Sequence, residues 1–519
     1  MASLLNHRGP EVIKLTSNIR IVAVALVACL LTAGTSAVAA DEIIYDIVIE
    51  NGRAMDPETG LDAIRNIGIS GGKIAHISPD ALDGKQKIDA SDHIVAPGFI
   101  DIHSHSPTPL GFSYQARDGV TTSLELEAGS YPLHEYGALI RDKAMINYGA
   151  SAGSLNARIA VMTDFRQSSL LAPMQRLSDN GQPVSRAFIA PASTPEIAKI
   201  KTRITDALDN GAIGIGVPLD YMNVAVKEPE LRMLFELGAS YSVPLFIHIR
   251  RGLAGDPEGL DEVLVLAKET GTRILICHLS HSAMQNTPLF LQKIRRARAN
   301  GTDVWTEVLP YNAGSVQIGA AVFNRDWRKI FNIDYKDVQL AETGEWFTKE
   351  SFERTRKENP GAEIIHHYLK EDWTKYLAIA PDVIISSDGL PALTTDKKVP
   401  PQGVGSFSKI LGTYVREEQA LEMMTALSKM TLQPAQLLEK AAPVFRLKGR
   451  LQLGMDADIT IFDPKTIRAN TTYLDPHQAS TGVKWLLVDG QIMIDNGTMK
   501  SDVYPGQFLK ATPSQLNAN

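Results

Sequence analysis

Cysteine is almost absent from this chain, which has only Cys29 and Cys277 in 519 residues. A chain with so few thiols is not a disulfide-stapled scaffold, so its stability must come from a hydrophobic core. Hydrophobic residues make up 44% of the sequence and charged residues 21%, as is typical of globular proteins. The length allows one large domain with appendages, or two domains.

An excess of positive charge is also missing. Lysine and arginine number 52 against 59 aspartates and glutamates, and the formal net charge is −7. No long basic run occurs anywhere in the sequence. Because phosphate backbones are bound mainly through clustered basic side chains, nucleic acid is not expected as a partner.

The most apolar segment is too short to span a bilayer, which takes about 20 residues. It runs from Ile21 to Leu31, eleven residues, after two basic residues and before a stretch of small residues that ends at Ala40. This pattern predicts that residues 1–40 are a cleaved signal peptide. The mature chain would then be periplasmic or secreted, with no transmembrane segment. The alternative is a lipoprotein anchored through Cys29.

Short strand-like stretches separated by Asn, Asp, Gly and Pro occur near both ends of the mature chain. They are Tyr45 to Gly52, Ile67 to Ile77, Ala457 to Pro464 and Val483 to Ile494. Helical periodicity is absent from the N-terminal stretches. We expect residues 41–98 and 441–519 to combine into one small composite β-sandwich domain.

Between residues 99 and 440, strand candidates alternate with helix candidates, the pattern of parallel βα units. This α/β pattern predicts a (β/α)8 TIM barrel. The eight strand candidates lie near residues 99–103, 120–127, 158–163, 212–217, 243–248, 273–278, 303–309 and 382–388. The clearest helix candidates are 194–210, 229–241, 257–270 and 288–300.

One connection in this region, from about 312 to 381, is too long for an ordinary loop. It contains Trp327, Trp346, His366 and His367. We interpret it as an insertion that covers the active face of the barrel.

Histidines stand at the carboxyl ends of three strand candidates, the end that carries the active site in such a barrel. His103 and His105 close the first strand, and alternate residues of a strand point the same way, so both imidazoles can reach one ion. His248 and His278 end the fifth and sixth strands. A single strand histidine is more often a core residue, but the repetition favours metal ligation. His281, in the loop beyond, is interpreted as facing the substrate or supporting a ligand.

Two buried acidic residues complete the candidate metal site. Glu125 and Glu127 share a face of the second strand, in an apolar setting where carboxylates need partners. We predict Glu127 as the ligand, because it lies nearer the carboxyl end, with a structural salt bridge as the alternative. Asp388 closes the last strand and is predicted to ligate the ion and to act as general base towards an activated water, unless it is a turn aspartate before Gly389.

Tyr311 and Arg250 are candidates for contacts with a substrate. Tyr311 follows the seventh strand and could donate a hydrogen bond to a developing oxyanion. Arg250 lies two residues past His248 and could bind a carboxylate in a bidentate manner. A packing tyrosine and a structural ion pair are the respective alternatives.

These residues resemble the amidohydrolase superfamily and, within it, the N-acyl-D-amino-acid deacylase or D-aminoacylase group. The resemblance runs from about residue 43 to 509. Its main motifs are Ala96-Pro-Gly-Phe-Ile-Asp-Ile-His-Ser-His105, Asp118-Gly-Val-Thr-Thr122, His248-Ile-Arg250, Pro310-Tyr311, Ser387-Asp-Gly-Leu-Pro391 and Gly454-Met-Asp-Ala-Asp-Ile-Thr-Ile-Phe-Asp-Pro464.

The resemblance implies one or two zinc ions at the strand ends and hydrolysis of an amide or cyclic amide. It carries ligation onto His103, His105, His248, His278 and Asp388, and oxyanion assistance onto Tyr311. Three departures stand out. Glu127 replaces the cysteine that the group usually has and could bridge two ions. Ser280 replaces a lysine, and the group's His-Pro-Arg segment after Ser-Asp-Gly is missing.

Together these features predict a zinc-dependent hydrolase whose small-molecule substrates are N-acyl amino acids, the D series favoured by resemblance alone. A cyclic amidase of hydantoinase or dihydroorotase type is the alternative within hydrolases. A binding or scaffold protein on a degenerate barrel would have lost ligands, whereas this chain keeps the full set. The sequence leaves a homo-oligomer open.

Overall fold

A sheet of eight parallel strands forms the centre of the computed structural model, which describes residues 43–163 and 182–512. The strands are ordered β16-β12-β11-β10-β9-β8-β7-β6. Their bounds are β6 (Phe99–Asp101), β7 (Val120–Ser130), β8 (Asn147–Gly153), β9 (Ile215–Val217), β10 (Leu245–Ile247), β11 (Ile274–Ile276), β12 (Val304–Val308) and β16 (Ile384–Ile385).

The two edges of this sheet meet just beyond its last strand. Asp388 N donates to His103 O at 2.8 Å, and His105 N donates to Gly389 O at 2.8 Å. Large buried side chains, among them Phe246 on β10, form a core cluster of the barrel. The (β/α)8 barrel predicted from the sequence is therefore confirmed.

One of the eight predicted strands is wrong. The third strand is β8, whereas residues 158–163 lie mostly in helix α2 (Ser154–Met162). The β8 sequence, Asn-Tyr-Gly-Ala-Ser-Ala-Gly, has no β-branched side chain, so it lacks the composition that predicts a strand. Small residues are needed there, because a Cβ at Gly149 would lie 2.7 Å from the Ile213 side chain.

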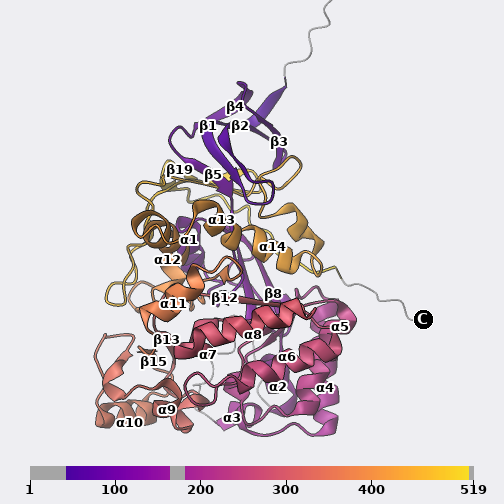
Figure 1. The fold of residues 1–519 in the computed structure, drawn as a ribbon, viewed down its shortest axis with the longest axis vertical. Coiled ribbons are helices and arrows are strands. Elements are labelled where there is room, and N and C mark those ends of the chain that lie inside the picture. Colours follow the sequence, from indigo (N-terminus) through magenta and orange to yellow (C-terminus); the bar gives the residue numbers. More distant parts are fainter. Residues whose placement is uncertain (1–42, 164–181, 513–519) are drawn as a thin grey trace, which may run out of the picture. The chain divides into compact units, whose positions relative to one another are not determined.

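Helices cover the outside of the barrel, and α2, α4, α5 and α6 pack in succession, each on the next (Figure 1). The four predicted helices are confirmed to within a residue or so as α4 (Thr194–Asp209), α5 (Glu228–Tyr241), α6 (Glu258–Thr270) and α8 (Thr287–Ala299). The others are α1 (Pro109–Arg117), α3 (Gln182–Ile189), α7 (Leu279–Ala283), α11 (Glu371–Ala378), α12 (Gln402–Lys409), the π-helix η7 (Ile410–Glu417), α13 (Met423–Met430) and α14 (Leu432–Leu438).

Strands from both ends of the described chain build a second, mixed sheet of nine strands. The halves join where β5 pairs antiparallel with β17. Its strands are β1 (Ile44–Asp56), β2 (Leu61–Ser70), β3 (Lys73–Ser78), β4 (Asp83–Asp89), β5 (Ile94–Pro97), β17 (Ile459–Phe462), β18 (Val483–Val488), β19 (Gln491–Asp495) and β20 (Thr498–Met499). The composite β domain is confirmed. Beyond β20 the chain returns to the barrel, where Phe508 stacks on Tyr148 of β8.

The long connection after β12 folds as an insertion with its own core. A three-stranded sheet, β13 (Gly314–Gln317), β15 (Glu363–His366) and β14 (Val338–Leu340), packs with helices α9 (Trp327–Phe331) and α10 (Lys349–Glu358). The last part of the predicted insertion differs, because α11 contacts α7, α8 and β12 and is a barrel helix.

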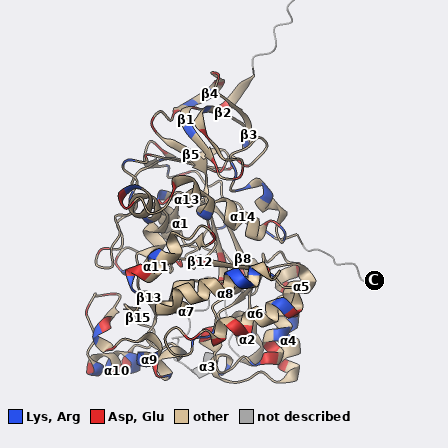
Figure 2. Ribbon diagram, viewed as in Figure 1, with Lys and Arg blue, Asp and Glu red and all other residues tan. Residues whose placement is uncertain are grey.

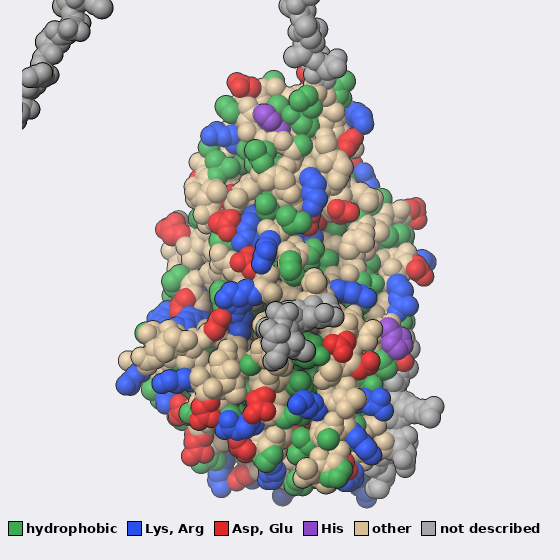
Figure 3. Space-filling view, turned by 90° about the vertical axis from the view of Figure 1, so that its right-hand side faces the viewer, with side chains coloured by type: hydrophobic (Ala, Val, Ile, Leu, Met, Phe, Trp, Pro, Cys, Tyr) green, Lys and Arg blue, Asp and Glu red, His purple; other side chains and the backbone are tan. Residues whose placement is uncertain are grey.

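Basic and acidic residues are interspersed along the outer helices (Figure 2). On the face drawn in Figure 3, exposed hydrophobic side chains are scattered among polar ones. None of the described helices combines the length and the apolar character that a bilayer span requires. The predicted signal peptide, residues 1–40 with Cys29, lies outside the described residues.

A buried ion cluster connects the β domain to the barrel. Lys448 Nζ lies 2.6 Å from Asp458 Oδ2 and 3.0 Å from Asp456 Oδ2. Asp458 Oδ2 also accepts a hydrogen bond from Asn147 Nδ2 on β8 at 3.0 Å. The burial of Lys448 opposes its charge, but the two aspartates raise its pKa above the usual range. Removing the amine would therefore leave buried negative charge uncompensated.

We expect Lys448→Met to lower the stability of the protein by about 3–5 kcal/mol, the usual cost of removing one partner of a buried ion pair. Denaturant unfolding followed by circular dichroism measures the change. Lys85→Met is the matched control, because Lys85 pairs with Asp46 on the surface and its side chain is 69% exposed. Equal effects of the two substitutions would contradict the assignment.

Candidate metal centre and substrate pocket

Glu127, near the end of β7, lies at the centre of a cluster of four imidazoles. Its Oε1 is 2.9 Å from His248 Nδ1 and 3.2 Å from His278 Nε2. Its Oε2 is 3.4 Å from His103 Nε2 and 3.3 Å from His105 Nε2. All five side chains are buried. The carboxylate therefore faces one histidine pair with each of its oxygens.

Asp388 contributes a second carboxylate to one of these pairs. Its Oδ1 lies 3.4 Å from His103 Nε2 and 3.3 Å from His105 Nε2. The residue has a φ of +50°, a left-handed conformation that costs energy in a residue other than glycine. The backbone hydrogen bonds at the barrel closure hold it there. The structure thus brings all six predicted ligand side chains together, and their role as ligands stays a prediction.

The cluster compensates its own charges. Burial by itself would raise the pKa of the Glu127 carboxyl, but hydrogen bonds from the four imidazoles hold that pKa well below its usual range. Burial would lower the pKa values of His103 and His105, and the neighbouring carboxylates raise both well above the usual range. Glu127 therefore stays ionised, which is the form that binds a cation.

The donor set fits metal ions. Ligand atoms of His103, His105 and Asp388 lie within 4.8 Å of one another, and so do those of His103, Glu127 and His278. Imidazole and carboxylate are common ligands of Zn²⁺. Because Glu127 presents a different oxygen to each histidine pair, the arrangement has room for two ions that share this carboxylate.

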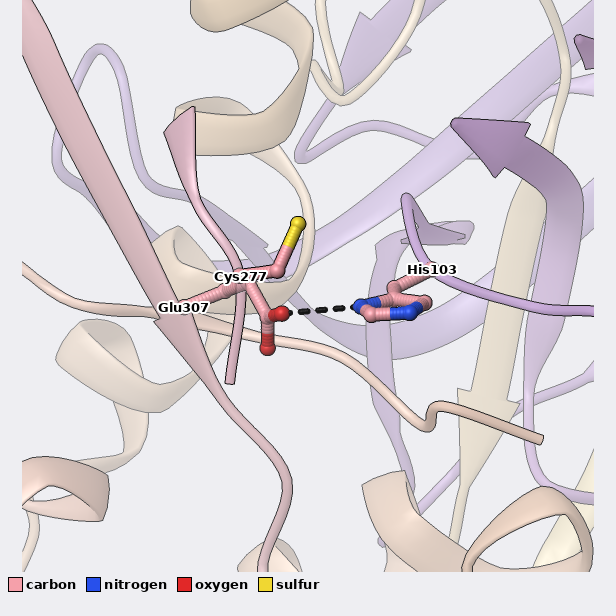
Figure 4. A group of neighbouring side chains, drawn as sticks. All are labelled: His103, Cys277 and Glu307. Carbon is pink, nitrogen blue, oxygen red and sulfur yellow. Dashed lines mark hydrogen bonds and ion pairs between the residues drawn. The ribbon is translucent and has the colours of Figure 1, made fainter. Parts of the chain in front are cut away.

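A second layer of carboxylates orients the histidines. Glu125 accepts a hydrogen bond from His105 Nδ1 at 2.8 Å. Glu307, at the end of β12, accepts one from His103 Nδ1 at 2.9 Å, and its carboxylate points at that ring in Figure 4. Such partners fix the tautomer and raise the basicity of the ligating nitrogen. The sequence analysis missed Glu307, although a glutamate in a buried strand was a signal.

Cys277 is the third side chain drawn in Figure 4, within 4.8 Å of ligand atoms of His103 and Glu307. It belongs to a hydrophobic core cluster with Leu275 and Phe246. Burial and the nearby carboxylates raise the pKa of its thiol well above the usual range. Its place among these core side chains gives Cys277 a packing role.

The two residues predicted to contact substrate, Arg250 and Tyr311, both have partners within the protein. Arg250 pairs with Glu262 at 2.9 Å and donates to the carbonyl oxygens of Asn223 and Val226, so it has the structural role that was its alternative. The hydroxyl of Tyr311 donates to Gly405 O at 3.3 Å. The side chains of a strand point alternately to its two faces, but this alternation does not extend to Arg250, because β10 ends at Ile247.

Arg251, the next residue, faces the pocket instead. Its guanidinium donates to Asp220 Oδ2 at 3.0 Å, to the Tyr368 hydroxyl at 3.1 Å and to His248 Nε2 at 2.8 Å. Arg325 shares the same aspartate, with Nη1 3.0 Å from Asp220 Oδ1. Two guanidinium groups against one carboxylate leave a net positive charge beside the cluster, which suits an anionic group.

His281 lines the smaller of the two cavities beside the cluster. Its Nδ1 is 2.6 Å from the Tyr368 hydroxyl, and its Nε2 has no hydrogen-bond partner among the described residues. Burial and the nearby positive groups lower the pKa of the imidazole well below its usual range, so the ring is neutral. Arg251 donates to the tyrosine oxygen, and the tyrosine donates to Nδ1, which leaves the proton on Nε2 pointing into the pocket.

Two neighbouring cavities lie beside the cluster. The smaller is about 30 Å³ and is lined by Arg251, His281, Tyr368 and Asp388, among others. The larger is about 380 Å³ and reaches from His105 along β13 and β15 to the segment from Leu390 to Val399. Ser315 and Val316 line both cavities. The insertion therefore covers the active face, as predicted.

Comparison with known proteins agrees with this geometry. An N-acyl-D-glutamate deacylase of Alcaligenes xylosoxydans xylosoxydans is 29% identical over 517 residues, with 91% of this chain and 98% of the relative covered. A D-aminoacylase of the same organism is 26% identical, with 86% and 94% covered. The chain is homologous to these two deacylases over most of its length. No protein-family model matches it.

A solved structure shares the fold across nearly the whole chain. The N-acyl-D-glutamate deacylase of Bordetella bronchiseptica, complexed with zinc and a phosphonate mimic of the tetrahedral intermediate, superposes with a TM-score of 0.73. It is 25% identical, and the match covers 90% of this chain and 100% of that protein. The expected resemblance to this group of deacylases is therefore confirmed.

The hydrogen bond from His103 to Glu307 makes a prediction about metal affinity. We expect Glu307→Gln to bind divalent metal about 10–100-fold more weakly, because the amide cannot raise the basicity of the imidazole as a carboxylate does. Metal content after dialysis against graded chelator concentrations measures this. Glu262→Gln, which removes only the partner of Arg250, should not change the affinity, and equal affinities in both variants would refute the assigned role.

Proposed function

We propose that the protein is a zinc-dependent amidohydrolase that cleaves the amide bond of N-acyl amino acids, with the D series favoured. The observation that carries this proposal is the Glu127 carboxylate set between two histidine pairs, in a chain that is homologous over nearly its full length to N-acyl-D-amino-acid deacylases. Hydrolysis of an amide bond is the chemistry that these relatives have in common.

One zinc site would be held by His103, His105 and Asp388, and a second by His248 and His278, with Glu127 shared between them. Bound zinc lowers the pKa of a coordinated water towards about 7 and polarises a carbonyl group. The relative from Bordetella bronchiseptica, which was solved with zinc, supports the choice of metal.

Asp388 is the general base in this proposal. Its carboxylate lies at the edge of the cluster, with 20% of its side chain exposed to the pocket, so it can reach both a nucleophilic water and a substrate nitrogen. It accepts the proton of the attacking water and then gives this proton to the leaving nitrogen. The products are a carboxylate and an amine.

His281 takes over the oxyanion role that the sequence assigned to Tyr311. Its Nε2–H points into the pocket without a partner among the described residues, and the Tyr368 hydroxyl fixes its tautomer. A fixed donor of this kind stabilises the negative charge that develops on the carbonyl oxygen. Arg251 holds the substrate carboxylate, which explains how the chain manages with Ser280 in place of a lysine.

We also propose export of the protein to the periplasm or the outside of the cell, on the basis of the sequence of residues 1–40 alone. A cyclic amidase remains the second candidate, because a dihydroorotase of Pelotomaculum thermopropionicum is 27% identical over 453 residues.

A substrate panel tests the main proposal. The zinc-loaded protein should hydrolyse N-acyl-D-amino acids faster than their L enantiomers or cyclic amides, and chelation followed by zinc should abolish and restore the activity. Asp388→Asn should lower kcat by about 10²–10⁴-fold, the usual contribution of a general base. A zinc-loaded protein that opened hydantoin or dihydroorotate rings but left every N-acyl amino acid intact would shift the assignment to the second candidate.

The carboxylate site at Arg251 makes a separate prediction. We expect Arg251→Lys to lower kcat/KM for N-acyl amino acids by about tenfold or more, because the planar fork that binds a carboxylate is lost. The matched N-acyl amino acid amides, which lack the carboxylate, should lose much less. A uniform loss on both substrate series would instead indicate that Arg251 only supports His248.

A further inference from the structure

The larger cavity borders the candidate metal centre. It shares His105 with the metal cluster, and it shares Ser315 and Val316 with the small pocket that Asp388 and Arg251 line. A substrate held at the cluster therefore has one part in the small pocket and another in the large cavity. The walls of the cavity must match the chemistry of that second part.

One wall of the cavity is a polar strip on the β13–β15 ladder. Gly314 pairs with His366 beside the cluster, and three residues further along Gln317 pairs with Glu363. Opposed residues share a face of the sheet, as do alternate ones, so Ser315, Gln317 and Glu363 stand on the same side, and all three line the cavity. At about 3.3 Å per residue, Glu363 lies roughly 10 Å along the strand from His366, which lines the small pocket.

Glu363 has no counterion among the described residues. Its Oε1 is buried and accepts no hydrogen bond from any residue that the structure describes, and none of the described basic groups forms an ion pair with it. Burial alone raises the pKa of its carboxyl to about 7. The other charged groups on the cavity wall are Glu342 and Lys397, which are exposed, and Lys398, which is partly exposed.

A buried carboxylate without a partner is unfavourable, and proteins seldom keep one unless a ligand satisfies it. An apolar or acidic substrate group in this cavity would leave Glu363 unpaired or repelled. An ammonium or guanidinium group would supply both the missing charge and the missing hydrogen-bond donors. The polar strip therefore favours a positive charge on the part of the substrate that lies in this cavity.

We propose that the large cavity receives a cationic group of the substrate, an ammonium or a guanidinium, and that Glu363 binds it. This inference rests on the proposed function and names the substrate class for the same site. The cation could be carried by the amino-acid side chain or by the acyl group, since both flank the amide. Glu363 is then the residue that determines specificity.

Paired substrates test this inference. N-acetyl-D-lysine is compared with N-acetyl-D-norleucine, and N-(6-aminohexanoyl)-D-leucine with N-hexanoyl-D-leucine, so that each arm carries the cation on one side of the amide. In one of the two pairs, the cationic substrate should have a kcat/KM at least about tenfold higher than its uncharged counterpart. Glu363→Gln should reduce that ratio about tenfold, and Glu363→Asp should retain part of it.

Glu342→Gln is the matched control, because it removes an exposed carboxylate from the same cavity. It should leave the ratio as in the wild type, and thermal unfolding shows whether each variant is folded. Equal rates within both pairs, a preference for N-acetyl-D-glutamate, or an unchanged ratio in Glu363→Gln would overturn the inference.

The two proposals fail separately. Hydrolysis without dependence on Glu363 overturns only the inference about the cation. If none of the amides is hydrolysed, the proposed function fails, and calorimetric binding of the same compounds decides the inference. Tighter binding of a cationic member, weakened about tenfold by Glu363→Gln, would still support it, and equal binding would reject it.

Discussion

The contact between the Glu127 carboxylate and four imidazoles is the constraint on which the rest of the active face depends. A buried carboxylate is tolerable only if partners of opposite charge or hydrogen-bond donors surround it. Those partners come from the ends of three other strands, β6, β10 and β11, so the barrel must hold four strand ends at fixed heights around one point. The parallel register of the strands provides this.

The hydrogen bonds that close the barrel also position Asp388. The hydrogen bonds from Asp388 N to His103 O and from His105 N to Gly389 O connect the last strand end to the first, and they run through the residues whose side chains form the cluster. Any error in closure would move the proposed base relative to the proposed ligands. Ser387 and Asp101 reinforce the connection through a side-chain hydrogen bond of 2.5 Å.

Sequence patterns were sufficient to locate the residues of the histidine–carboxylate cluster, but not the residues that line the pocket. Strand periodicity and strand ends located the four histidines, Glu127 and Asp388, because the geometry of a strand is repeated along the chain. The third strand was missed because β8 is selected for small size rather than for β-branched residues. Arg251 and Glu363 were missed because loops and the insertion have no such period, and only tertiary contacts show which way their side chains face.

The division between barrel and insertion has a consequence for specificity. The barrel supplies the cluster and Arg251, which in the proposed function hold the scissile amide and the substrate carboxylate. The β13–β15 ladder supplies Ser315 and Glu363, which contact neither the cluster nor Arg251 by any hydrogen bond among the described residues. Changes on the ladder can therefore alter which substrates fit without disturbing the reacting groups. A chain with Glu127 in place of the usual cysteine can in this way keep the reaction while the insertion selects a different substrate.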